Sequence, residues 1–415
     1  MVLPISRTDN GGRDFNAFWA GQSISLVGSQ VTTLALPLTA ILALGATAAE
    51  LGALQAVRFL PFLIFALPLG IVTDRVRRRP LLIAADLGRA AALASVPLAA
   101  VQGALRIELL YGVAFVTGAL TVLFDVAYVT VVPSLVTTER VVAANAKLLT
   151  SSSVAEVGGP AVAGQLVHAL GAPFAMLVDA ASFVVGATSI ALIRRPESSP
   201  PSARNRALGR EIREGLAASF GNRYVRAVGL MAATYNLIET AILTLFIPFA
   251  IRDLRFDPAA LGLVLGTGAV GALTGALVAT SLGRRLGIGP ALVVAMIVEC
   301  VAFVPIGALS EASPAVASIL VVALFANGFG LAVSNVHSVS VRQTVTAPAL
   351  LGRMNAGYRF LVTGTVPIGA VLGGALGEAV GLRFALVILG LVLPVSLLWI
   401  AMSPLPRLRA LGSVC

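Results

Sequence analysis

Residues 50–80 read ELGALQAVRFLPFLIFALPLGIVTDRVRRRP, an apolar run that ends in a basic cluster. An apolar run of about twenty residues is long enough to cross a bilayer as a helix. Arginines collect in the loops on the cytoplasmic side of membrane proteins. This stretch therefore predicts a spanning helix that runs inward and ends at a cytoplasmic loop.

The same pattern continues through the whole chain. Its 415 residues are 58% hydrophobic and only 12% charged, whereas soluble domains carry about 25% charged residues. Lipid offers no partner to an unpaired backbone group, so every span must be helical. We predict an all-α polytopic membrane protein and exclude a soluble enzyme. The twelve predicted spans are residues 15–42, 50–73, 80–102, 108–133, 141–167, 173–193, 226–251, 259–282, 290–309, 314–340, 351–377 and 382–403.

The loops between the spans predict the orientation. With the N-terminus inside, the cytoplasmic loops receive the basic clusters at residues 75–79, 194–226 and 284–285. The outer loops receive only Arg106, Arg252, Arg255 and Arg383. This bias predicts a multi-pass protein of the inner (cytoplasmic) membrane with both termini cytoplasmic. The net charge of +10 therefore reports topology and predicts no nucleic-acid partner.

The chain repeats itself when it is shifted by 210 residues. Leu51-Gly52 falls on Leu261-Gly262, and Asn145-Ala146 falls on Asn355-Ala356. Each half holds six spans and therefore has the same orientation, which is a transporter architecture. We predict two parallel, pseudo-symmetric six-helix bundles around a central cavity.

The domain boundaries follow from this repeat. We expect the first bundle at residues 1–194, a cytoplasmic linker at 195–224 and the second bundle at 225–415. In the linker Leu208, Ile212 and Leu216 recur at four-residue spacing between charged residues. That spacing predicts a short amphipathic helix on the inner membrane face.

The loop after the second span carries the most specific motif: Gly70, Asp74, Arg75, Arg78 and Arg79. Glycine permits tight packing, and an aspartate can sit against a helix N-terminus while arginines hold it. The motif resembles the loop 2–3 signature of the major facilitator superfamily, although Arg77 stands where many members have glycine. The resemblance implies a gating contact between the two halves that breaks as the transporter rocks.

The fifth span carries Gly159, Pro160 and Gly164, which allow a close-packed, bendable helix. They resemble the Gly-Pro signature of antiporters in the superfamily, with Ala155 and Ala163 in place of two glycines. The resemblance favours antiport, whereas ordinary packing of small residues would explain the same pattern.

The wider pattern resembles the bacterial drug-efflux branch of the superfamily, which includes macrolide exporters and the enterobactin exporter. The matching residues are Arg13-Asp14-Phe15, Pro61, Asp86-Leu-Gly-Arg89, Phe124-Asp125, Ala144-Asn145-Ala146, Asp179-Ala-Ala-Ser-Phe183, Gly357-Tyr358-Arg359 and Pro367-Ile-Gly369. The resemblance implies secondary active export of a small amphipathic molecule, such as a drug, an antibiotic or a siderophore, by proton antiport with alternating access. The expected partners are that substrate, a proton as coupling ion, and membrane lipids, and we expect a monomer.

Intramembrane charges are costly and point to function. In this chain they are Arg58, Asp86, Arg89, Asp125, Glu156, Asp179, Glu239, Glu299 and Arg359. Depth counted at about 1.5 Å per residue allows two pairs, Arg89 with Asp125 and Arg58 with Glu156. These pairs could equally be structural and never titrate.

A proton-coupled exporter needs a carboxyl group whose exposure or partner changes during the cycle. The candidates are Glu156, Glu239 and Asp125. Asp125 ranks last because pairing with Arg89 would keep it ionised, and Glu239 has no evident partner in its own span. The polar residues expected to line the cavity are Gln22, Gln30, Tyr235, Asn236, Asn327 and Asn335.

Other functions remain open at this point. An importer of a nutrient or a lysophospholipid would share the architecture, and so would a membrane sensor, although a sensor should carry an added soluble domain. An enzyme would need a nucleophile or metal constellation, and the sequence holds no such motif. We expect no enzyme activity, no cofactor, no metal and, without a Walker motif, no ATP hydrolysis.

Overall fold

The computed structural model describes residues 10–73, 76–137, 140–193, 221–311, 313–347 and 350–409. Within these residues the chain is helical and contains no β-strand. Each predicted span coincides with one helix or with a run of consecutive helices, so the all-α polytopic fold class is confirmed. The predicted linker helix around Ile212 lies outside the described residues.

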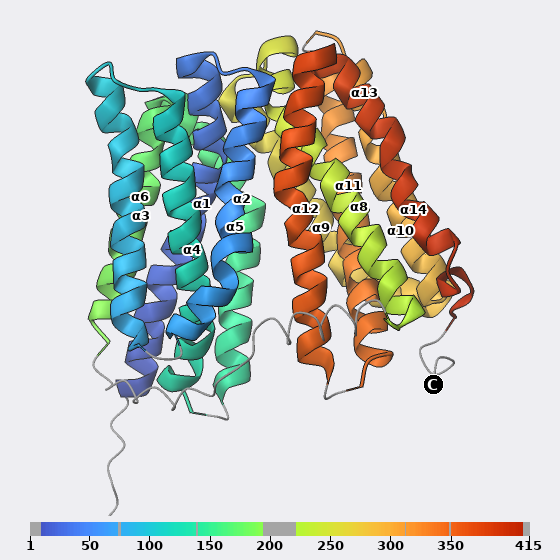
Figure 1. The fold of residues 1–415 in the computed structure, drawn as a ribbon, viewed down its shortest axis with the longest axis horizontal. Helices are drawn as coiled ribbons and strands as arrows, with labels where there is room; N and C mark the ends of the chain where they lie inside the picture. Colours follow the sequence, from blue (N-terminus) through green and yellow to red (C-terminus); the bar gives the residue numbers. More distant parts are fainter. Residues whose placement is uncertain are drawn as a thin grey trace, which may run out of the picture. The chain divides into compact units, whose positions relative to one another are not determined.

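The helices follow in order along the chain (Figure 1). In the first half they are α1 (Asn10–Leu44), α2 (Ala48–Thr73), α3 (Arg78–Val101), α4 (Ile107–Leu135), α5 (Val141–Leu170) and α6 (Ala172–Ala191). In the second half they are α8 (Arg223–Pro248), the π-helical turn η2 (Phe249–Asp253), α9 (Pro258–Leu286), α10 (Ile288–Phe303), the 3₁₀ turn η3 (Ile306–Ala308), α11 (Pro314–Thr344), α12 (Leu351–Val380), α13 (Leu382–Val392), the 3₁₀ turn η5 (Leu393–Val395), α14 (Ser396–Ala401) and the 3₁₀ turn η6 (Leu405–Arg407).

Eleven stretches of helix among the described residues are long and apolar enough to cross a membrane. Helix α5 is the predicted span that is not among them, although it is 30 residues long. Between residues 147 and 156 it carries Lys147, three serines at residues 151–153, and Glu156. Polar side chains of this kind inside a spanning segment are tolerated where they face other helices or a cavity.

Two predicted spans are interrupted at prolines. The span at 290–309 consists of α10 and η3 with Pro305 between them, and the span at 382–403 consists of α13, η5 and α14 with Pro394 inside η5. Proline has no N–H to donate to the preceding turn, so the regular α-helical ladder breaks there. In a membrane neighbouring helices can satisfy the freed carbonyl groups.

The helix bounds follow the repeat of the sequence. Helices α2 and α9 begin at residues 48 and 258, α3 and α10 at 78 and 288, and α5 and α12 at 141 and 351, each pair 210 positions apart. Single glycines connect α5 to α6 and α12 to α13. Gly171 and Gly381 both have φ of 83°, a conformation that glycine adopts without steric cost.

The chain forms two compact units. One holds Met1–Thr39 and Leu60–Arg204, and the other holds Ala40–Phe59 and Asn205–Cys415. In the first unit α3 packs against both α4 and α6. In the second unit α11 packs against α9 and α10, while α8 packs against α12.

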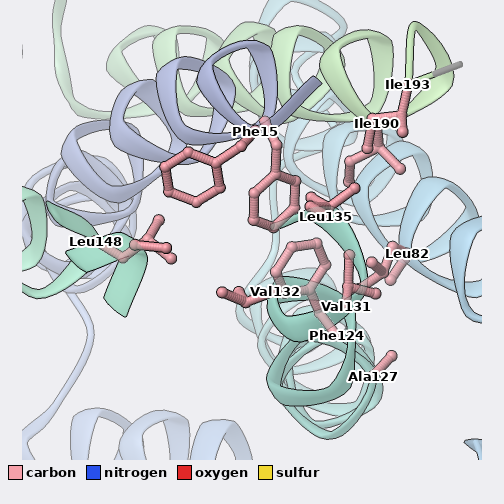
Figure 2. Packing of buried hydrophobic residues seen from close by; sticks show 13 residues of the cluster. Phe15, Leu82, Phe124, Ala127, Val131, Val132, Leu135, Leu148, Ile190 and Ile193 are labelled. Carbon is pink, nitrogen blue, oxygen red and sulfur yellow. The ribbon is translucent and has the colours of Figure 1, made fainter. Parts of the chain in front are cut away.

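The first unit has a hydrophobic core at the end that carries the start of α1. Phe15 and Phe18 of α1 pack with Leu82 of α3 and with Phe124 and Leu135 of α4 (Figure 2). Rings stack within this core, with the centroids of Phe18 and Tyr128 5.7 Å apart. This packing fixes the rotation of α3 and α4, and it therefore fixes the direction in which their charged residues point.

Candidate functional site

The second unit contains a buried polar cluster that begins on α8. Tyr235 and Glu239 are four residues apart, so they lie on the same face of the helix. The Tyr235 hydroxyl group donates a hydrogen bond to Oε1 of Glu239 over 3.3 Å. The tyrosine is 4% exposed, whereas Glu239 is only partly buried.

A second carboxyl group enters this cluster from α10. Glu299 is 1% exposed, and the side chains of Ser334 and Tyr235 lie beside its carboxyl group. It also lies close enough to Glu239 for the two carboxyl groups to interact electrostatically. One of its oxygens, Oε1, has no hydrogen-bond partner among the described residues.

Asn327 of α11 completes the cluster. Its Nδ2 donates to the Tyr235 hydroxyl oxygen over 2.7 Å, so that hydroxyl accepts one hydrogen bond and donates another. Three helices thus meet at Tyr235. We refer to Tyr235, Glu239, Glu299 and Asn327 as the acidic cluster.

The first unit holds a buried charge at the matching position of the repeat. Arg89 stands 210 residues before Glu299, and Phe124 stands 210 residues before Ser334. The Arg89 guanidinium carbon lies 4.5 Å from the ring centroid of Phe124 and 4.1 Å from that of Phe183. Arg89 also forms an ion pair with Asp86, one turn earlier on α3. The two units therefore place opposite charges at equivalent positions.

Asp179 of α6 extends this network in the first unit. It is 1% exposed, and it accepts hydrogen bonds from the hydroxyl groups of Thr32 and Ser182. Its charge also acts on Arg89. The buried part of the network thus contains two carboxyl groups and one guanidinium group.

The predicted pairing of Arg89 with Asp125 stays a prediction. The ion pair that the structure describes for Arg89 is with Asp86, while Asp125 is exposed on α4 and acts on Arg89 electrostatically. The pairing of Arg58 with Glu156 also stays a prediction. Arg58 lies over the ring of Phe59. Glu156 is exposed on α5 and accepts a hydrogen bond from Ser152 over 3.1 Å.

The predicted cavity residues lie in different surroundings. Tyr235 and Asn327 meet in the acidic cluster, whereas Asn236 donates a hydrogen bond to the carbonyl oxygen of Val362 on α12 over 2.8 Å. Gln22 is 6% exposed and its Nε2 has no partner among the described residues. Asn335 is exposed on α11.

The Gly-Pro motif forms a close helix contact. A Cβ atom on Gly159 would lie 2.4 Å from Cγ of Gln30, so this glycine lets α5 approach α1. Gly164 is buried, and Pro160 lies inside α5 without interrupting it. The contact supports the expected close packing and leaves an antiport role untested.

The loop 2–3 motif is described in part. Gly70 lies in α2, and Asp74 and Arg75 fall outside the described residues. Arg79 donates a hydrogen bond to the carbonyl oxygen of Ile193 over 3.2 Å, which ties the start of α3 to the end of α6. Arg78 begins α3. The gating role of this motif stays a prediction.

The role of Glu299 was not predicted from the sequence, which shows this residue only as one of the intramembrane charges. Glu299 lies on another helix than Glu239, and no local spacing encodes their proximity. The repeat carried a usable signal, because position 299 matches the buried Arg89. The described residues contain no group of three or more side chains able to hold a metal ion.

Comparison with known proteins agrees with this architecture. The chain is 26% identical over 424 residues to the multidrug efflux pump Tap of Mycobacterium tuberculosis, an alignment that covers 98% of this chain and 96% of Tap. It is 26% identical over 248 residues to macrolide efflux protein A of Streptococcus pyogenes. That second alignment covers 58% of this chain and spans only 60% of the length of the relative.

A solved structure shares the fold. The nucleoside transporter NupG matches with a TM-score of 0.74 and 14% identity, over 94% of this chain and 98% of NupG. A likeness at this identity concerns the fold alone. The transmembrane secretion effector family matches residues 12–414. The chain therefore belongs to this family of the major facilitator superfamily, and it is a multi-pass membrane transporter, not an enzyme.

Proposed function

We propose that this protein exports a small amphipathic, drug-like molecule from the cytoplasm. The observation that carries the proposal is the alignment with the multidrug efflux pump Tap, which covers 98% of this chain. The partial alignment with macrolide efflux protein A supports the same class of substrate. A siderophore-like or antibiotic substrate fits the same description.

Export is driven by protons in this proposal. The chain carries no Walker motif that would supply energy from ATP. A coupling residue must bind a proton on one side and release it on the other. Glu239 is the strongest of the three predicted candidates because it is partly buried and bonded to Tyr235, whereas Asp125 and Glu156 are exposed.

Transport proceeds by alternating access between two parallel six-helix bundles around a central cavity, with residues 1–194 and 225–415 as the bundles and 195–224 as the linker. The shared 210-residue spacing of the helix bounds supports this division. In this proposal Gly70, Asp74, Arg75, Arg78 and Arg79 form the gating network at the cytoplasmic side. Gln22, Gln30, Tyr235, Asn236, Asn327 and Asn335 provide the polar groups of the cavity.

The protein acts as a monomer in the inner membrane, with both termini in the cytoplasm. The basic clusters at residues 75–79 and 284–285 support this orientation, because such residues are retained on the cytoplasmic side. Lipids are its immediate surroundings, and the coupling ion and the substrate are its functional partners.

Uptake into inverted membrane vesicles tests the proposal. A panel of antibiotics, dyes and siderophores is added to vesicles from an efflux-deficient host that expresses the chain. Export predicts accumulation inside inverted vesicles that requires a pH gradient and is abolished by a protonophore. An importer would instead accumulate its substrate in right-side-out vesicles. A sensor would move none of the compounds, and either of these results would refute the proposal.

A further inference from the structure

Two carboxyl groups in the second unit both lie beside the Tyr235 hydroxyl group, and neither has a basic partner among the described residues. Glu239 comes from α8 and Glu299 from α10, and neither forms an ion pair among the described residues. The titratable groups next to them are Tyr235 and Cys300. The other polar groups that α11 and α14 bring to this region are those of Asn327, Ser334 and Ser396, which carry no charge.

The cluster is short of hydrogen-bond donors. A tyrosine hydroxyl group has one hydrogen, and both Glu239 and Glu299 lie within reach of that of Tyr235. The single hydroxyl hydrogen of Ser334 is likewise shared between the backbone carbonyl oxygen of Leu331 and the carboxyl group of Glu299. Oε1 of Glu299 is left without a partner although this residue is 1% exposed. A carboxylate buried in this way is costly, and one added proton would supply the missing donor.

The first unit shows how a buried charge is neutralised at the matching position of the repeat. Arg89 has a counter-ion on its own helix, Asp86, three residues earlier. Glu299 occupies the matching position of the repeat, and the residue three positions earlier is the apolar Met296. The second unit therefore has a buried ionisable group at this position, but no charged residue at the position that corresponds to Asp86.

The space around Glu299 restricts what can neutralise it. A Cβ atom on Gly330 of α11 would lie 2.6 Å from Cγ of Glu299, so the helices are in close contact at this carboxyl group. A bulky organic cation would have to separate α10 from α11, whereas a proton needs no space. Glu239 is the more exposed of the two carboxyl groups.

We propose that Glu239 and Glu299 form one proton-binding site, in which the two carboxyl groups share a single proton and Tyr235 positions them. The proton arrives from water at Glu239, binds one carboxylate oxygen, and leaves the pair with one negative charge in place of two. The inference rests on the proposed function, since it identifies the group that carries the coupling proton. It adds Glu299 as half of the site.

Proton binding can be measured without transport. The purified full-length protein, with glutamate labelled by carbon-13, is titrated in lipid nanodiscs while the infrared band of protonated glutamate is recorded. Ordinary glutamates are ionised above about pH 6, so in that range we expect one band, which disappears as the pH rises further. Glu239→Gln and Glu299→Gln should each remove this band or change its midpoint, because the proton belongs to the pair. The double variant should lack the band.

Two variants act as controls. Cys300→Ala alters the buried neighbour of Glu299 without removing a carboxyl group or adding a hydrogen-bond donor, and it should leave the band unchanged. Tyr235→Phe keeps the ring and removes the hydroxyl group, so it should change the midpoint. Variants are compared only when their thermal unfolding in detergent shows a cooperative transition like that of the wild type.

The outcomes separate the site from the function. If either single variant keeps the wild-type band and midpoint, or if sodium ions at constant pH displace the proton, a shared proton site is ruled out. If Cys300→Ala changes the band as much as the glutamate variants do, the band reports general packing and the proposal fails. If the band responds to both glutamate variants as expected while vesicles accumulate no compound, the shared proton site is supported and the exporter assignment is refuted. If uphill export persists while neither glutamate variant changes the band, the exporter assignment is supported and the shared proton site is refuted.

Discussion

Arg89 shows how single residues make a charge tolerable inside this bundle. Its guanidinium group lies between the rings of Phe124 and Phe183 and is paired with Asp86. An arginine between two aromatic faces gains cation–π attraction, and the carboxylate balances its charge. The sequence predicted Arg89 as a buried charge but did not predict its ion pair with Asp86, and the predicted pairing with Asp125 stays a prediction. The depth of a residue can be counted from the sequence, whereas the direction of its side chain depends on how the helix is rotated.

The pair of Arg89 and Asp86 gives the first prediction. Removing one partner leaves an uncompensated buried charge, so Arg89→Ala should lower the free energy of unfolding by about 3–5 kcal/mol. The double variant Arg89→Met with Asp86→Leu should recover most of that loss. Thermal unfolding of the purified protein in detergent measures both. The exposed Glu156→Gln serves as the control and should change the free energy of unfolding by less than about 0.5 kcal/mol. Additive losses in the double variant would show that the two residues are independent.

The acidic cluster could be predicted only as separate residues. Tyr235, Asn327 and Glu239 were each expected to be functional because polar groups in spans seldom occur without a reason. The hydrogen bond between Tyr235 and Asn327 joins positions 92 residues apart, on helices α8 and α11. No local spacing encodes such a contact. The role of Glu299 was missed for the same reason.

Among the elements, the spans themselves could be predicted well. Runs of apolar residues indicate where helices cross, and the structure places a helix or consecutive helices on every predicted span. The breaks were not predicted. Pro37, Pro61 and Pro97 lie inside unbroken helices, while Pro305 and Pro394 interrupt theirs. Whether a proline breaks a helix depends on which neighbours satisfy the freed carbonyl group.

Two adjacent glycines on α5 give an element-scale prediction. A Cβ atom on Gly159 would lie 2.4 Å from Cγ and 2.5 Å from Cβ of Gln30, whereas a Cβ atom on Gly158 meets nothing within 4 Å. Gly159→Ala should therefore cost about 1–3 kcal/mol of unfolding free energy through overpacking. Gly158→Ala should be neutral or stabilise by up to about 1 kcal/mol, since alanine favours the helix. Chemical unfolding of the two variants provides the comparison, and equal losses would disprove a specific contact between α5 and α1.

The connection between α2 and α3 gives a second prediction at this scale. Asp74→Asn removes the charge of the Gly70–Asp74–Arg75 motif without changing the size of the side chain. A charge-assisted hydrogen bond contributes about 1.5–3 kcal/mol, so transport should slow by about tenfold or more. Insertion and thermal stability should stay at wild-type values. If vesicles with matched protein content transport at the wild-type rate, the predicted gating role of this motif is wrong.

At the scale of the whole molecule, the segment Ala40–Phe59 belongs to the same compact unit as the second half of the chain. Arg252 donates a hydrogen bond to the carbonyl oxygen of Ala46 over 2.6 Å, and a Cβ atom on Gly377 would lie 3.1 Å from Cβ of Ala48. The repeat predicted the helices of each half. It could not predict this contact, because the contact joins a residue of the first half to residues of the second half. Under alternating access, this contact has to open once in every cycle.

A cross-link tests that requirement. Cysteines in place of Ala48 and Gly377, with Cys300→Ala and Cys415→Ser in the background, should form a disulfide on mild oxidation, because their Cβ atoms lie close together. Oxidation should stop uphill transport, and a reductant should restore it. A Cβ atom at position 377 would also lie 2.5 Å from Cδ2 of Leu245, so each single cysteine variant is measured first in the reduced state. Oxidation should leave the activity of either single variant unchanged. Transport at the full rate with the disulfide formed would contradict the proposed opening.

Proton movement measured during drug transport tests proton-coupled export most directly. The protein is reconstituted in liposomes that contain a pH-sensitive dye, and a transported drug is added against an imposed pH gradient. We predict that the drug dissipates the gradient only when the protein is present. Glu239→Gln should abolish this proton flux and uphill export while labelled drug still exchanges downhill. Uphill drug transport without proton movement in the wild type, or an unchanged proton flux in Glu239→Gln, would contradict the account.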